Sequence, residues 1–78
     1  MQKSAYTREY HRVVTTLKKA RVAAGLTQGE VAQRLEVYAS YVSKCESGER
    51  RLDVVELSHF CRVYGLTLVD FLNLARLE

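Results

Sequence analysis

Residues 39–47 combine small and polar side chains with an apolar spacing typical of a helix. Val42 and Cys45 recur at helical intervals and are expected to face a core. The outward positions of the same helix are Ala39, Ser40, Ser43 and Lys44. Lysine can donate to O6 and N7 of guanine, serine can bond either base type, and an alanine methyl can meet a thymine methyl. This outward set has the chemistry of reading bases in the DNA major groove.

A second short helix is predicted just before this one, over residues 28–35 of the run GLTQGEVAQRL. Thr27 and Glu30 have the spacing of a capping box, and Leu26 with Val31 can close a hydrophobic staple over it. The inward positions of the two helices are Val31, Ala32, Leu35, Val37, Val42 and Cys45. Two short helices joined by a tight turn form a helix-turn-helix, whose second helix enters the major groove.

Residues around these two helices suit contact with DNA phosphates. Gln28 opens the first helix, where its side chain and the free amides of the first turn can meet a phosphate. Arg50 and Arg51 follow the second helix and can clamp the DNA backbone; the alternative is that they only aid solubility. The Tyr41 hydroxyl either donates to a phosphate or covers the edge of the core. We expect phosphate contacts from Thr27, Gln28, Tyr41, Arg50 and Arg51.

Apolar spacing and capping signals predict three further helices. The first spans about residues 7–24 and ends at Gly25, with an apolar stripe of Tyr10, Val13, Val14, Leu17, Ala20 and Ala24. The fourth begins at the capping box of Asp53 and Glu56, and the fifth, over 67–77, begins at that of Thr67 and Asp70. The fold class is therefore all-α, a compact five-helix domain.

Length and composition agree with one small domain over residues 1–78. The 78 residues include no proline and carry a formal net charge of +3, from 12 Lys and Arg against 9 Asp and Glu. No apolar run approaches a membrane span, and the start lacks a secretory signal, so we expect a cytoplasmic protein. Cys45 and Cys61 are then expected to stay reduced and to pack as small core residues.

Taken together, these motifs resemble the Cro/C1-type (XRE-like) helix-turn-helix family of phage repressors and small bacterial regulators. The match covers about residues 18–71 and rests on R-x-x-x-G-L-T-Q (21–28), x-E-V-A-x-R-L and V-S-K-x-E-x-G (42–48). The resemblance implies a lambda-repressor-like fold and base-reading positions at Ala39, Ser40 and Lys44. It implies a bacterial or phage-encoded protein that is associated with the nucleoid. It also implies a structural ion pair between Arg21 and Glu46.

Two positions depart from the family pattern. Glu36 stands where the family usually has a glycine at positive φ, which should cost roughly 1 kcal/mol, so we predict that Glu36→Gly raises the melting temperature. Tyr38 stands where the family often has a serine or threonine that caps the recognition helix. That helix start is expected to lack a side-chain cap.

A homodimer on a palindromic operator is expected, because two half-sites about 34 Å apart multiply affinity. The fifth helix carries more apolar residues than one face needs, and the candidate contacts are Val69, Leu72, Leu74 and Leu77. The other interpretation is frayed apolar residues at a C-terminus. The N-terminal extension, residues 1–6, is a second candidate for crossing to a partner.

Other functions are weighed against a dimeric DNA-binding repressor. His11 and His59 have no triad-like neighbours and no glycine-rich phosphate loop is present, so an enzyme is not expected. The two cysteines and two histidines lack metal-site spacing, and no cofactor or small-molecule ligand is evident. The alternative is a protein-interaction module of the same fold, such as an antitoxin or adaptor with a protein partner. Double-stranded DNA is the expected partner.

Overall fold

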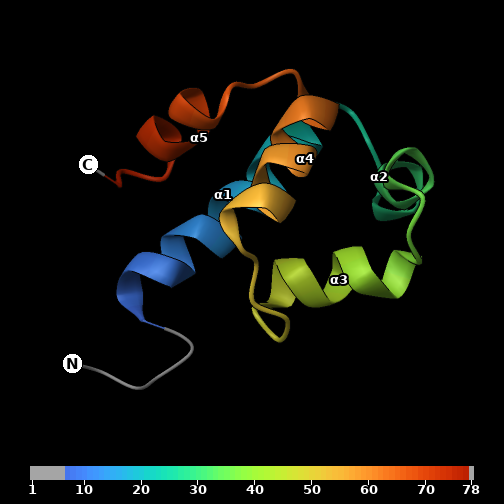
Figure 1. The fold of residues 1–78 in the computed structure, drawn as a ribbon, viewed down its shortest axis with the longest axis horizontal. Helices are drawn as coiled ribbons and strands as arrows, with labels where there is room; N and C mark the ends of the chain where they lie inside the picture. The colour runs from blue at the N-terminus through green and yellow to red at the C-terminus, as the bar shows by residue number, and fades with distance from the viewer. Residues whose placement is uncertain (1–6, 78) are drawn as a thin grey trace.

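A computed structural model describes residues 7–77 and shows five helices joined by short turns (Figure 1). They are α1 (Arg8–Ala23), α2 (Gln28–Leu35), α3 (Ala39–Ser47), α4 (Val54–Tyr64) and α5 (Leu68–Leu74). The described range contains no strand, so the all-α prediction is confirmed. The predicted extension at residues 1–6 lies outside this range, as does residue 78.

Side chains cap four of the five helices, which explains where each begins. The three predicted capping boxes are all formed, at Thr27 with Glu30, at Asp53 with Glu56 and at Thr67 with Asp70. At α1 the Thr7 hydroxyl accepts the amide of Tyr10 at 3.1 Å. Only α3 lacks a side-chain cap, because Tyr38 occupies its N-cap. The Tyr41 amide donates to the Tyr38 carbonyl at 3.0 Å, and the amides of Ala39 and Ser40 are left for solvent or a ligand.

Left-handed residues end most of the helices. Gly25, Gly48 and Gly65 have φ values of 74°, 84° and 73°. The prediction that α5 extends to residue 77 is wrong: the helix ends at Leu74, and Arg76 takes φ 61°. In that turn the Arg76 amide donates to the Asn73 carbonyl at 3.1 Å and the Leu77 amide to the Leu72 carbonyl at 2.9 Å. These bonds satisfy the last carbonyls of α5 and turn the chain back toward the core.

The core is built mainly from α1 and α4, with the other helices packed around them. Fully buried side chains come from every helix: Leu17, Val31, Val42, Cys45, Phe60, Cys61 and Phe71. Both cysteines are free thiols, and burial raises the pKa of each. Two apolar predictions are wrong. Ala24 is exposed because it is the C-cap of α1, and Val37 is 37% exposed because it lies at the rim of the turn.

The helices that flank α1 and α4 lie on two sides of the molecule (Figure 1). α2 packs on α3 and α4, and α3 also contacts α1. α5 packs on α4 and α1 at the other end. Because α1 touches both α3 and α5, it connects the two surfaces described below.

Candidate nucleic-acid interface

The outward face of α3 is presented to solvent by burial of its other face. Val42 and Cys45 are completely buried. The four residues predicted to read bases, Ala39, Ser40, Ser43 and Lys44, are all exposed. No hydrogen bond joins the side chain of Ser40, Ser43 or Lys44 to another described residue. These donors and acceptors are therefore available to an external partner.

The turn before α3 fixes the angle at which it leaves α2. Glu36 has φ 59° and ψ 45°, the left-handed conformation predicted from the sequence. Its amide donates to the Gln33 carbonyl at 3.2 Å, and the Val37 amide donates to the Ala32 carbonyl at 3.0 Å. This geometry closes α2 as a glycine would, with a residue that disfavours it.

A buried carboxylate ties α3 to α1 and α2. The Arg21 Nε lies 2.7 Å from the Glu46 Oε2, and the Arg21 Nη2 donates to the Glu46 Oε1 at 3.2 Å. The Arg21 Nη1 also donates to the Leu26 carbonyl at 2.9 Å. The Glu46 side chain is 3% exposed, and its hydrogen bond raises the pKa of Arg21 although burial opposes this. The pair is the one that the family resemblance implied, and it holds the recognition helix against α1.

Gln28 joins this network through its side chain. Its Nε2 donates to the Glu46 Oε1 at 3.0 Å, so one amide hydrogen is used inside the protein. An amide nitrogen carries two hydrogens, and the second is left for another acceptor. The sequence pattern gave no sign of this link, because it depends on how α2 lies against α3.

Tyr41 and Arg50 form a cluster with Glu56. The Arg50 Nη2 lies 2.6 Å from the Glu56 Oε2, and the Tyr41 hydroxyl donates to the same oxygen at 3.3 Å. The Arg50 guanidinium carbon stands 4.8 Å from the Tyr41 ring centroid. Burial is the main cause that raises the pKa of Tyr41 to about 12, so its hydroxyl keeps its proton at neutral pH. Glu56 was predicted only as a capping residue, and its second oxygen proves to organise this basic edge.

Arg51 lies on the other side of the loop, against α1. Its guanidinium carbon is 4.4 Å from the centroid of the Tyr10 ring, and the Tyr10 hydroxyl accepts the Leu52 amide at 2.8 Å. The two arginines predicted as one clamp therefore occupy separate positions. Arg50 is close to α3, whereas Arg51 covers α1.

Thr27 has its hydroxyl engaged in the cap of α2. It accepts the Glu30 amide at 3.1 Å, and the Glu30 Oε1 accepts the Thr27 amide at 2.8 Å. These bonds to Thr27 lower the pKa of Glu30. The hydroxyl hydrogen of Thr27 donates to no described residue, so it remains available to a phosphate oxygen.

The four residues predicted for dimer contact differ in burial. Val69 and Leu74 are 65% and 60% exposed, and Leu72 is half-buried. Leu77 instead packs against the core, because the turn after α5 brings it back. Within residues 7–77, no helix has both the length and the apolar character to cross a bilayer. The same range contains no group of three or more histidine, cysteine or acidic side chains arranged to hold a metal ion.

Two short helices at a fixed angle, with an exposed polar face on the second, define a helix-turn-helix protein. Residues 12–74 match the family described as "Helix-turn-helix domain". The chain belongs to the XRE-like helix-turn-helix family, and this membership makes it a DNA-binding transcription regulator. The family predicted from the motifs is confirmed.

Solved structures agree with this assignment. An XRE-family like protein from Pseudomonas syringae pv. tomato str. DC3000 is 44% identical, with a TM-score of 0.81 over 87% of this chain and 83% of that chain. The clp gene regulator ClgR from Corynebacterium glutamicum is 24% identical, with a TM-score of 0.81 over 90% of this chain and 74% of that chain. The likeness to ClgR shows the fold alone. No curated protein matches the chain in sequence.

Proposed function

We propose that this regulator is a dimeric repressor, acting in the cytoplasm, that binds a palindromic operator through α3 in the major groove. The observation that carries the proposal is the exposed outward face of α3, where Ser40, Ser43 and Lys44 bond to no other described residue. A polar face without internal partners is expected where a protein reads bases. Lys44 suits guanine, Ser40 suits either base type, and Ala39 suits a thymine methyl.

Phosphate contacts on both sides of α3 follow from the positions of the surrounding residues. Gln28 has a second amide hydrogen at the start of α2, where the helix dipole also favours an anion. Thr27 donates its hydroxyl hydrogen beside it. On the other side, Arg50 and Tyr41 exchange Glu56 for a phosphate, and Arg51 contacts the backbone from α1. These contacts set the register of α3, and the base contacts set its specificity.

The dimer forms through the face of α5 that carries Val69 and Leu72. Val69 is 65% exposed, and Leu72 lies about 60° away around the helix, so the two form one continuous surface. Leu74 is five positions from Val69, about 140° around, and lies on the side facing α1. An apolar residue this exposed on a short helix is stabilised when a second copy covers it.

Selection of bound sites from a random duplex pool tests the proposal. Enrichment of an inverted repeat with half-sites about 34 Å apart is the expected result. Binding that depends only on salt, with no enriched sequence, would instead favour a protein-interaction module such as an antitoxin or adaptor.

Lys44→Ala tests the role of α3 within the selected site. Loss of one lysine-guanine contact should weaken binding about tenfold and relax selectivity at one base pair per half-site. Lys19→Ala is the matched control, because Lys19 is an exposed lysine on the side of α1 near α5. Equal weakening on every sequence would assign Lys44 to a phosphate, and equal weakening by both variants would leave only a general charge effect.

A further inference from the structure

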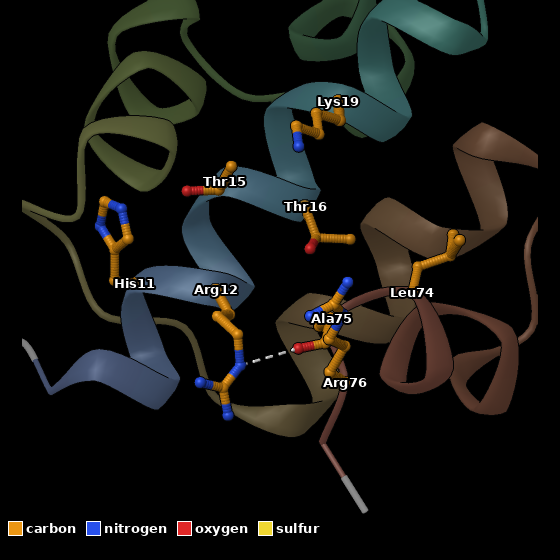
Figure 2. A pocket seen from close by; sticks show the side chains of 8 residues that line it. All are labelled: His11, Arg12, Thr15, Thr16, Lys19, Leu74, Ala75 and Arg76. Atoms are coloured by element: carbon orange, nitrogen blue, oxygen red, sulfur yellow. Dashed lines mark hydrogen bonds between the residues drawn. The ribbon is translucent and has the colours of Figure 1, made fainter.

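A groove lies between α1 and the end of α5 (Figure 2). Its volume is about 320 Å³. We call it the α1–α5 groove and define it by Arg12, Thr16, Lys19, Leu74 and Arg76. Figure 1 shows α5 on the other side of α1 and α4 from α3. The α5 wall of the groove therefore lies away from the surface proposed to bind DNA.

Three cations line the α1–α5 groove without an ion-pair partner in the described part of the chain. Arg12 and Lys19 are two helical turns apart on the same face of α1, and Arg76 approaches from the turn after α5. The Arg12 Nε donates to the Ala75 carbonyl at 3.2 Å, which fixes the guanidinium and leaves its terminal nitrogens for another acceptor. Glu9 borders Arg12 and Arg76 in an adjoining hollow but lies within 4.0 Å of neither charge.

Thr16 adds a polar group inside this ring of charge. It is only 8% exposed, and its hydroxyl makes no hydrogen bond to a described residue. In Figure 2 its oxygen points toward the part of the groove where Arg12 and Arg76 lie. This hydroxyl is reached by solvent in the groove, and it can donate to an acceptor atom bound there.

The groove continues into an apolar hollow along α1. This second space, about 350 Å³, shares Thr16, Lys19 and Leu74 with the first and is extended by Ala20 and Ala23. Leu74 is 60% exposed and lies along this hollow. A charged end and an apolar end thus lie next to each other.

We propose that the α1–α5 groove binds an organic carboxylate that carries a short apolar chain. The carboxylate accepts from the terminal nitrogens of Arg12, from Arg76 and from the Thr16 hydroxyl, and Lys19 adds positive charge. The chain lies along Ala20, Ala23 and Leu74. Glu9 nearby disfavours a dianion such as a phosphate monoester, and the volume falls at the lower end of small-ligand sites. This site goes beyond the DNA-binding function and does not depend on it.

Titration of the full chain with octanoate, followed by amide NMR spectra, tests the proposal. We expect the largest saturable shifts in the amides of residues 11–24 and 72–77, with a Kd on the order of 1 mM for so small a ligand. Acetate, which lacks the chain, and octylammonium, which has the opposite charge, should cause no saturable shift. Equal shifts with octylammonium would overturn the role of the cations.

Matched variants locate the site. Lys19→Gln should weaken octanoate binding at least about threefold, since one nearby charge is lost, and Lys18→Gln should not, because Lys18 is exposed outside the groove. Thr16→Val, which keeps the side-chain shape, should weaken binding as well. Equal losses in the two lysine variants would overturn the proposal. Two other results would also overturn it. Shifts of the groove amides with protein concentration would show that a second copy occupies the groove, and shifts with a duplex of random sequence would show that DNA does.

Discussion

Replacing Glu36 by glycine should stabilise the protein, because the backbone at this residue is left-handed. Glu36 has φ 59° and ψ 45°, and its exposed side chain makes no hydrogen bond to a described residue. The left-handed conformation costs an L-residue about 1–2 kcal/mol, and glycine loses part of that gain through its greater freedom when unfolded. The free energy of unfolding should therefore rise by about 1 kcal/mol, which for a domain of this size raises Tm by roughly 4–8 °C.

A second variant separates the backbone from the charge of Glu36. This carboxylate lies at the C-terminal end of α2, which disfavours a negative charge, but it also shares a hollow with Arg34 and Arg62. Glu36→Ala removes the charge and keeps the Cβ atom. The backbone effect is therefore the stability of Glu36→Gly minus that of Glu36→Ala, and we expect about 1 kcal/mol.

The reciprocal change is Gly25→Ala. Gly25 has φ 74°, and an added Cβ atom would meet nothing within 4 Å, so only the backbone conformation opposes it. This variant should lower the free energy of unfolding by about 1 kcal/mol. Thermal and urea unfolding followed by far-ultraviolet circular dichroism measures all three variants. If Glu36→Gly and Glu36→Ala have the same Tm, or if Glu36→Gly melts below the parent, the left-handed conformation is not the source of the strain.

Two further predictions concern the interior. Glu46→Ala leaves Arg21 without its carboxylate and should lower the free energy of unfolding by about 3 kcal/mol. The double variant Arg21→Met/Glu46→Leu leaves no unpaired charge, so its free energy of unfolding should fall by less. Urea titration of both variants checks this. Tyr64→Phe removes a buried hydroxyl that has no hydrogen-bond partner among the described residues, and burial raises the pKa of this hydroxyl. The free energy of unfolding should therefore stay the same or rise by up to about 1 kcal/mol. A clear loss of stability in Tyr64→Phe would mean that this hydroxyl is hydrogen-bonded in solution.

The helices could be predicted because their signals are local. Thr27 with Glu30 and Asp53 with Glu56 are three residues apart, so the sequence contains each cap in full, and the structure forms both. The left-handed conformation at Glu36 was predicted from the family resemblance instead, because the family usually has a glycine at this position. The end of α5 could not be predicted, because Ala75 and Arg76 do not prevent a helix. It is set by the packing of Ala75 and Leu77 on the core.

The partners of long polar side chains required the tertiary structure. Glu56 serves its own helix cap with one oxygen, as its spacing predicts, and receives Arg50 and Tyr41 on the other. Nothing in the spacing of these three residues indicates that they meet. The same is true of Gln28 and Glu46, which are 18 residues apart. Contact between residues on different helices depends on crossing angles that a single sequence does not specify.

Helix α1 explains how the two surfaces can act together. Lys19 and Arg21 are two residues apart, about 200° around the helix, so they face different sides of it. Lys19 lines the α1–α5 groove, and Arg21 holds Glu46 at the end of α3. Any shift of α1 caused by a ligand in the groove must therefore change the Arg21 to Glu46 contact or move α3 with it. If octanoate binds without altering the amide spectra of residues 39–47, α1 is rigid enough for the two surfaces to act independently.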